Sequence, residues 1–414
     1  MLLYLVAGYP WTRLIRKMTS IERFSLAFLV GAGLSTFVWF LLNRLGLGFD
    51  ISSLVLSVAL TGSLGWLLTH KNKGMDYSPK GSFSTLEKSL LGVTLLLILL
   101  AVIVSSYNPI TAWDAVTLYD YRGLVIAGTH SLASIETGSY YLSYPLMTSL
   151  THASVYLLKG DNPQTFYALL YAALLGIIYG RMSVWTNRRY ALITTLLVAG
   201  NPFMWQHATI AYTNLPYAAF LVAGLFYAPS SILLSGLLLG LSIWTRNTEP
   251  FWLAGLLLIG YYAWKEKQFV QAAIATLVTL VFQFAWSIYV SGVSIRSQVA
   301  MTTNTHIYTL SIFGKMLKNT PMITHYLTEF IVSPYLGIWL VALASLIVAP
   351  TALIGAVWLI AAMVIGGVAV FSTYYASWYS IGGSATRMLL FIVPLVTVCG
   401  MLAQYKLKDI HAKK

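Results

Sequence analysis

Long apolar stretches separated by short polar segments dominate the chain. A helix needs about 17 to 25 mainly apolar residues to cross a bilayer. We predict twelve membrane-spanning helices, some of them short, at roughly residues 24–43, 51–69, 86–106, 165–182, 190–204, 215–228, 231–245, 250–264, 269–290, 330–348, 351–371 and 388–404. The pattern therefore predicts an all-α protein, a polytopic transmembrane helix bundle.

The composition supports a membrane protein. Hydrophobic residues make up 58% of the chain and charged residues 9%, and the mean hydropathy is +0.75. So few charges cannot cover the surface of a water-soluble globule. Residues 1–9 are apolar but too short to span, and no basic segment precedes them, which argues against a signal peptide. We expect them to form an interfacial or re-entrant piece.

The basic residues indicate how the spans are oriented. If the loop before the first span is cytoplasmic, the outer side carries only eight of the 25 Lys and Arg residues: Arg44, Arg122, Lys159, Arg246, Arg296, Lys315, Lys318 and Arg387. The rest are cytoplasmic, as the positive-inside rule requires. We predict cytoplasmic termini. The net charge of +13 then reflects orientation and contact with anionic membrane lipids, and we expect no nucleic-acid partner.

We expect a single integral membrane domain over residues 1–414. It divides into N-terminal spans (1–106), a first outer loop (107–164), central spans (165–290), a second outer loop (291–329), and C-terminal spans with a cytoplasmic tail (330–414). Residues 142–159 of the first outer loop are predicted to form a juxtamembrane helix lying on the membrane. Its apolar face would hold Leu146, Leu150, Ala153 and Leu157, and its polar face Ser149, His152, Tyr156 and Lys159.

Several kinds of site are not indicated. Cys399 is the only cysteine, so the chain can form no intramolecular disulfide. The histidines lack the spacing of metal ligands, and no glycine-rich phosphate-binding motif is present. We therefore expect no metal site, no cofactor and no nucleotide-driven motor.

The segment Trp113-Asp114-Ala115-Val116-Thr117-Leu118-Tyr119-Asp120-Tyr121-Arg122 carries the clearest chemistry. It follows an apolar run directly, so its two carboxylates and its guanidinium sit at the mouth of a predicted span. Ionisable groups are costly to desolvate there, and they mark functional sites more often than packing. Among neighbouring aromatic rings, desolvation would also make a carboxylate more basic.

A family resemblance follows from this segment together with Tyr144-Pro145-Leu146. Two later motifs match as well: Gly240-Leu241 followed by Arg246, and Thr386-Arg387-Met388 with Pro394. In this order the motifs resemble the GT-C class of polyprenyl-phosphate-dependent glycosyltransferases, in the branch of protein O-mannosyltransferases and the lipid A aminoarabinose transferase. Asn214 departs from the pattern, because relatives often have an acidic residue before Leu-Pro.

The resemblance implies a GT-C-like fold and an inverting transfer at the outer face, from a polyprenyl-phosphate-linked sugar donor to a hydroxyl of a protein, lipid or glycan acceptor. Asp114 would be the general base, although an Asp here could also cap a helix. Asp120 would hold the acceptor or pair with Arg122. Substrate binding would involve Arg122, Tyr144, His152, Arg246 and Arg387, the arginines holding the leaving phosphate, with Glu249 neutralising Arg246.

Two other functions remain open. An O-antigen-ligase-like transferase using a diphosphate-linked donor would carry His and Arg in a late outer loop, as residues 291–329 do with Arg296 and His306. A lipid or solute transporter would share the composition. However, transporters place ionisable groups near the bilayer midplane, whereas here those groups lie at span ends. The aromatic residues Tyr374 to Tyr379 in the third outer loop suit a membrane-interface belt.

Overall fold

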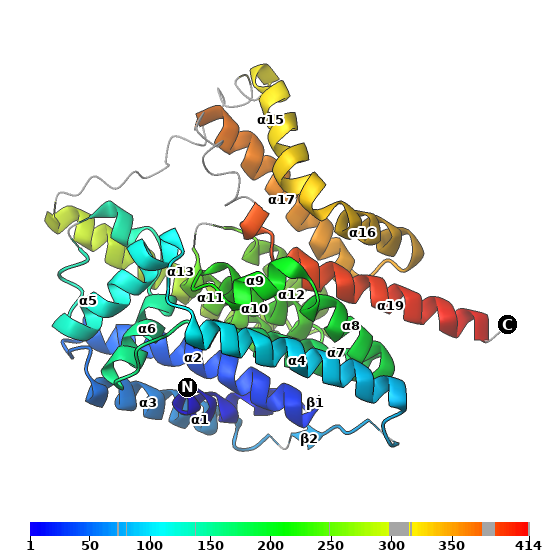
Figure 1. The fold of residues 1–414 in the computed structure, drawn as a ribbon, viewed down its shortest axis with the longest axis horizontal. Coiled ribbons are helices and arrows are strands. Elements are labelled where there is room, and N and C mark those ends of the chain that lie inside the picture. The colour runs from blue at the N-terminus through cyan, green and yellow to red at the C-terminus, as the bar shows by residue number, and fades with distance from the viewer. Residues whose placement is uncertain are drawn as a thin grey trace. The chain divides into compact units, whose positions relative to one another are not determined.

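The computed structural model describes residues 1–72, 74–79, 81–136, 138–247, 249–297, 314, 317–374 and 386–412. The chain divides into two compact units, Met1–Val299 and Ala300–Lys414. Each unit is built of helices, as Figure 1 shows. The predicted all-α class is thus confirmed, and the single domain over residues 1–414 stays a prediction.

The first unit begins with α1 (Leu2–Gly8) and the 3-10 helix η1 (Tyr9–Leu14). Three long helices follow: α2 (Ser20–Arg44), α3 (Ile51–Thr69) and α4 (Thr85–Tyr107). Each starts at a capping box, in which the side chain of Thr19, Asp50 or Ser84 accepts a hydrogen bond from the backbone N–H three residues later. Two-residue strands, β1 (Lys17–Met18) and β2 (Met75–Asp76), pair in parallel before α2 and before α4.

The segment after α4 folds into short helices. These are the π-helix η2 (Ala115–Asp120), α5 (Tyr121–Thr129), the 3-10 helix η3 (Ser139–Leu142) and α6 (Met147–Leu157). The amide of Asn162 donates to the carbonyl oxygens of Ser105 (3.0 Å), Ser106 (3.1 Å) and Asn108 (3.0 Å). One side chain therefore ties the end of the segment back to its beginning.

The unit continues with α7 (Thr165–Trp185), α8 (Arg188–Ala199), α9 (Pro202–Ala208), α10 (Asn214–Tyr227), α11 (Ile232–Thr245), α12 (Trp252–Glu266) and α13 (Phe269–Ser297). Helices α10 and α11 form the core, since every residue of α10 and nearly every residue of α11 is buried. Helix α11 packs against α10, α12 and α13, and α2 packs against α7.

The second unit contains α15 (Thr320–Tyr326), the π-helix η5 (Leu327–Val332), the 3-10 helix η6 (Ser333–Tyr335), α16 (Leu336–Val348), α17 (Ala352–Tyr374) and α19 (Ile392–Ala412). Helix α16 packs against α19. The hydroxyl of Tyr335 donates to the carbonyl oxygen of Thr386 at 2.8 Å, which ties η6 to the segment before α19.

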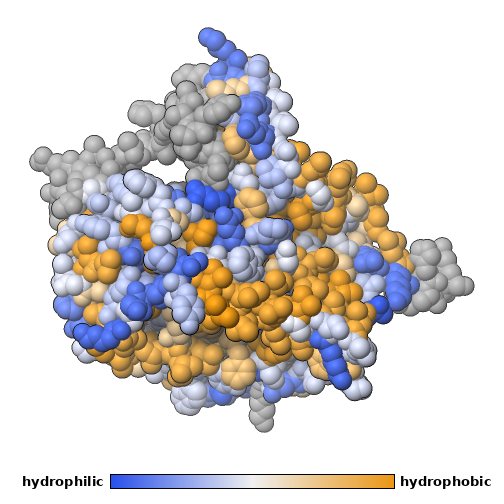
Figure 2. Space-filling view, in the orientation of Figure 1, coloured by the Kyte–Doolittle hydropathy of each residue, from blue (hydrophilic) through white to orange (hydrophobic). Residues whose placement is uncertain are grey.

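Seven helical segments in the described part of the chain are long and apolar enough to span a membrane: Ser20–Arg44, Ile51–Thr69, Thr85–Tyr107, Thr165–Trp185, Phe269–Val293, Thr320–Val348 and Ala352–Ala369. Figure 2 shows an apolar surface over α4, where Leu95, Leu96 and Leu99 are exposed. The chain is an integral membrane protein.

The predicted number of spans is larger than this set, because several predicted spans are short helices. Helices α8, α10, α11 and α12 have 12, 14, 14 and 15 residues. The prediction of one continuous span at residues 190–204 is wrong, since α8 ends at Ala199 and α9 begins at Pro202. Asn201 caps α9, and a proline fits the first turn of a new helix but not the interior of a continuing one.

The helix ends of the first unit form two polar ends. At the end that we call the basic end, Glu22 pairs with Arg181, Arg23 with Asp76 and Arg188 with Glu87. Helix α4 starts there and runs roughly 34 Å to the opposite end, where Asn162 meets Asn108. Residues 17–23, 76–87 and 181–188 of the first unit, all in segments predicted to be cytoplasmic, meet at the basic end. Residues 107–164 lie at the other end, which we call the loop end.

Helix α1 packs unusually closely against α2. A Cβ atom on Gly31 would lie 1.7 Å from the carbonyl oxygen of Tyr4, and one on Gly8 would lie 1.9 Å from that of Ala27. The buried hydroxyl of Tyr4 donates to Ser154 Oγ at 2.8 Å. Residues 1–9 therefore fold against the protein as a short helix, and its backbone contact with α2 requires glycine on both sides.

We expect Gly31→Ala to lower the stability of the first unit by about 1 to 3 kcal/mol, because the added methyl group must push two helix backbones apart. Gly92→Ala is the control, since Gly92 is exposed on α4 with open space around it. That change should be neutral or stabilising by up to about 1 kcal/mol. Thermal unfolding in detergent measures both, and equal midpoints would contradict the close contact.

Candidate active site

Asp114 lies at the start of the segment that the sequence singles out. It directly precedes η2, its backbone is helical, and its side chain makes no capping hydrogen bond. The alternative that Asp114 is a helix cap is therefore not supported. Its side chain is part-exposed, and its neighbour Trp113 is 75% exposed. Asp114 is thus partly accessible from outside the fold.

Tyr119, on the π-helix η2, is buried and contacts residues from two other segments. Its hydroxyl lies 3.1 Å from Thr213 Oγ1 at the start of α10, and its ring packs 6.2 Å from the ring of Tyr144. Burial, followed by the charges of Tyr144 and Asp114, raises the pKa of Tyr119, although Arg246 opposes them. Tyr119 therefore stays protonated and lies within electrostatic reach of Asp114 and Arg246.

Arg246 directly follows α11 and is buried. Its Nη2 lies 2.5 Å from Glu249 Oε1 and 3.4 Å from the hydroxyl of Tyr144, and its guanidinium lies 4.9 Å from the Tyr144 ring centre. The expected neutralisation by Glu249 is confirmed. Burial alone would lower the pKa of Arg246, but Glu249 raises it above its ordinary value. The Nε donor has no hydrogen-bond acceptor among the described residues.

Arg122 is fully buried, and its guanidinium donates hydrogen bonds to other groups of the protein. Its Nε donates to Ser149 Oγ at 2.9 Å, and Nη1 donates to the carbonyl oxygens of Tyr141 (3.0 Å) and Tyr144 (2.8 Å). Nη2 donates to Pro145 at 3.4 Å. Burial lowers the pKa of Arg122 to about 10, so it stays charged at neutral pH. This guanidinium is placed to hold the loop at residues 141–145.

Asp120 joins a different network from the one expected. Its Oδ1 accepts hydrogen bonds from Tyr156 Oη at 2.5 Å and from His152 Nδ1 at 2.9 Å. His152 Nε2 then lies 3.0 Å from the hydroxyl of Tyr167 on α7. Burial and the bond to Asp120 raise the pKa of Tyr156. No ion pair joins Asp120 to Arg122 in the described part of the chain, so that alternative is wrong.

The predicted faces of the juxtamembrane helix are right, but both faces are buried against the protein. Ser149 and His152 do share a face, and that face contacts Arg122 and Asp120. Leu150 and Ala153 on the other face are fully buried too. Helix α6 is therefore enclosed on both faces, because its polar side chains bond to α5 and η2 instead of to lipid headgroups.

Other predicted site residues lie elsewhere. Arg387 belongs to the second unit, between Thr386 and α19, and is half-buried. Its assignment to the donor phosphate stays a prediction. His306, Lys315 and Tyr375 to Tyr379 lie outside the described residues.

Sequence reasoning gave no role in the site to several residues that build it. Tyr156 and Tyr167 extend the Asp120–His152 network, and Thr213 positions Tyr119. Tyr156 had a usable signal, because it lies four residues after His152 on the same helical face. Thr213 and Tyr167 had none, since their contacts join segments that are distant in sequence.

The part-exposed carboxylate of Asp114 and the buried guanidinium of Arg246 both lie within electrostatic reach of Tyr119, and Arg246 contacts Tyr144. That combination can accept a proton and stabilise an anionic leaving group. No cluster of metal ligands occurs among the residues that the structure describes.

No family model and no curated protein matches the chain. Among solved structures, the chain is similar to the crystal structure of ArnT from Cupriavidus metallidurans bound to undecaprenyl phosphate, with a TM-score of 0.51 and 15% sequence identity. The match covers 79% of this chain and 61% of that protein, so the chain spans about three fifths of its length. The likeness is one of fold: the chain has a GT-C-like, ArnT-like membrane fold, as the sequence motifs led us to expect.

Proposed function

We propose that the protein is a membrane glycosyltransferase that moves a sugar from a polyprenyl-phosphate donor to an acceptor hydroxyl. The observation that carries the proposal is the junction of the Asp114 segment with Arg246. These residues are far apart in sequence, yet both lie within electrostatic reach of Tyr119. The ArnT structure of the same fold has undecaprenyl phosphate bound, which supports this type of donor.

In the proposed reaction, Asp114 takes the proton of the acceptor hydroxyl. The acceptor oxygen then forms a bond to the anomeric carbon of the sugar as the bond from that carbon to the phosphate oxygen breaks. The polyprenyl phosphate leaves with the electron pair, and attack from the opposite side inverts the anomeric centre. Arg246 stabilises the phosphate, because a guanidinium stays charged in a desolvated site and can donate two hydrogen bonds.

We assign the other site residues supporting roles. Tyr144 lies against Arg246 and would orient its guanidinium, and Arg122 would fix the loop that presents Tyr144. Asp120 and His152 would hold α6 and η2 together beside the acceptor. Arg387 remains a second candidate for the donor phosphate, on the resemblance alone.

We further propose that the loop end faces outward and the basic end faces the cytoplasm. Arginines are held in ion pairs at the basic end, where exposed Lys71 precedes β2 and exposed Lys88 lies in the first turn of α4. The positive-inside rule places such an end in the cytoplasm.

Asp114→Asn should lower turnover by about 10² to 10⁴ while donor binding survives, because the amide keeps the shape but loses the basicity. Asp120→Asn is the matched comparison: it weakens the bonds from His152 and Tyr156 and should reduce turnover through positioning. Single-turnover transfer from a radiolabelled polyprenyl-phosphate sugar measures both. Normal turnover in Asp114→Asn would remove this residue from the role of base.

Arg246→Lys should weaken binding of polyprenyl phosphate about tenfold or more, because lysine keeps the charge beside Glu249 but loses the paired donors. Arg188→Lys is the control, since Arg188 is similarly enclosed and also paired with a glutamate, but at the basic end. Titration of both purified variants with undecaprenyl phosphate tests this. Equal affinity in the two variants would contradict the role of Arg246.

Cysteine labelling tests the orientation. Asp161 and Asn72 are both exposed, so a cysteine at either position can be reached by a reagent on its own side of the membrane. In a Cys399→Ser background, Asp161→Cys at the loop end should react with an impermeant maleimide in intact cells. Asn72→Cys at the basic end should react only after the membrane is opened. The reverse pattern would place the proposed site on the cytoplasmic side.

A further inference from the structure

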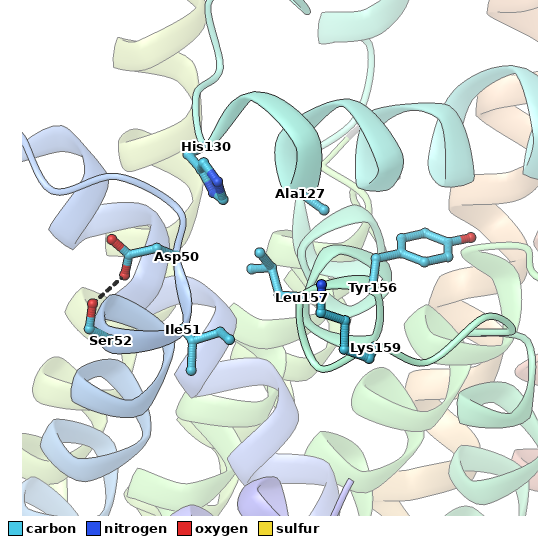
Figure 3. A pocket seen from close by; sticks show the side chains of 8 residues that line it. All are labelled: Asp50, Ile51, Ser52, Ala127, His130, Tyr156, Leu157 and Lys159. Carbon is cyan, nitrogen blue, oxygen red and sulfur yellow. Dashed lines mark hydrogen bonds between the residues drawn. The ribbon is translucent and has the colours of Figure 1, made fainter.

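A cavity of about 500 Å³ opens at the loop end between the start of α3 and the ends of α5 and α6 (Figure 3). We call it the α3–α6 cavity. Its polar lining residues are Asp50, Ser52, His130, Tyr156 and Lys159. Figure 3 shows Asp50 and Ser52 on one side, with Tyr156 and Lys159 on the other. Arg246 and Tyr144, which we assign to the donor, are not part of its wall.

Two of the polar lining residues, His130 and Asp50, are held in place by hydrogen bonds. His130 Nδ1 lies 2.7 Å from the carbonyl oxygen of Phe49, so we assign the proton to Nδ1 and leave Nε2 as an acceptor. The N–H of Phe49 donates back to the carbonyl of His130 at 3.0 Å. Asp50 Oδ1 accepts from Ser53 N–H at 2.8 Å and from the Ser52 hydroxyl at 2.7 Å.

Two lining residues have an unusual backbone. His130 and Lys159 have φ angles of +56° and +65°, in the left-handed region that residues with a Cβ atom rarely adopt. Both residues follow the C-terminal end of a helix, where a left-handed residue commonly ends the helix and fixes the direction of the chain after it. In the described chain the third residue of this kind outside glycine is Lys267, at the end of α12 and away from the cavity.

The lining combines the chemistry that a sugar requires. Asp50 offers a carboxylate that can accept from hydroxyl groups, and Lys159 offers an ammonium that can donate to them. The Asp50 pKa is lowered, chiefly by the hydrogen bond from Ser53 N–H, so its carboxylate is ionised. One negative and one positive charge balance each other, which suits a neutral polyol better than an anion. Ile51 and Leu157 add apolar surface for the C–H face of a ring.

We propose that the α3–α6 cavity binds a neutral, hydroxyl-rich sugar ring belonging to the acceptor. This rests on the proposed transferase function and adds the class of acceptor, a glycan or glycan-bearing molecule. Tyr156 connects the cavity with the candidate active site, because it lines the cavity while its hydroxyl donates to Asp120 on η2. A ring held here would therefore lie next to a residue that is hydrogen-bonded to η2, the helix that begins after Asp114.

Saturation-transfer NMR on the purified full-length chain tests the proposal, with the methyl α-pyranosides of mannose, glucose and galactose as probes. At least one glycoside should receive saturation from the wild-type protein. Ile51→Trp should fill the cavity, and Lys159→Gln should remove its donor. Each change should weaken binding at least about fivefold. Lys267→Gln is the control, because it makes the same substitution in the same left-handed conformation elsewhere, and it should change nothing.

Three outcomes would overturn the proposal. They are no saturation of any glycoside, unchanged binding in both cavity variants, or binding of inorganic phosphate that Lys159→Gln abolishes. Asp114→Asn should retain glycoside binding while it loses transfer. Glycoside binding that responds to the cavity variants, in a protein that transfers no sugar, would leave the sugar site standing and refute the transferase function. Normal sugar transfer, with glycoside binding unchanged in the cavity variants, would refute the sugar site and leave the transferase function supported.

Discussion

The geometry of the loop end depends on the buried guanidinium of Arg122. A buried charge without partners is very costly, so its donors must be satisfied by the protein. The carbonyl groups of Tyr141, Tyr144 and Pro145 accept from it, as does Ser149 on α6. This requirement fixes the segment before α6 against α5, and with it the position of the Tyr144 ring beside Tyr119 and Arg246.

The rest of the first unit supports this end as a scaffold. Apolar α10 and α11 fill the centre, and ion pairs close the opposite, basic end. Interactions in an apolar core are non-directional, whereas hydrogen bonds and ion pairs fix particular groups. The polar networks therefore determine local geometry at the two ends, while the helices between them set the distance that separates those ends.

The sequence predicts the long helices well, because their apolar runs end at strong signals. The run at residues 51–69 coincides with α3, whose start is fixed by the Asp50 cap. It predicts short helices less well, since the apolar pattern continues across the break at Asn201 and Pro202. The Asn-Pro pair indicates that break, but the hydrophobicity of the surrounding residues favoured one continuous span in the prediction.

The candidate site shows a similar division. Asp114 and Arg246 were identified from motifs, and in the structure both lie within electrostatic reach of Tyr119. The partner of Asp120 was not predictable in the same way. Arg122 is its neighbour in sequence, but His152 and Tyr156 reach it only because α6 folds back against η2. Contacts of this kind depend on tertiary packing, which a local sequence pattern does not contain.

Photo-cross-linking tests the central claim most directly, that a polyprenyl phosphate binds beside Tyr119, Tyr144 and Arg246. An undecaprenyl phosphate analogue with a photoreactive group next to the phosphate would be activated on the purified protein, and the labelled peptides would be mapped by mass spectrometry. Labels within residues 113–144 and 246–249 are expected, and excess undecaprenyl phosphate should compete them away. Competable labels found only at the basic end, around Arg181 and Arg188, would contradict the claim.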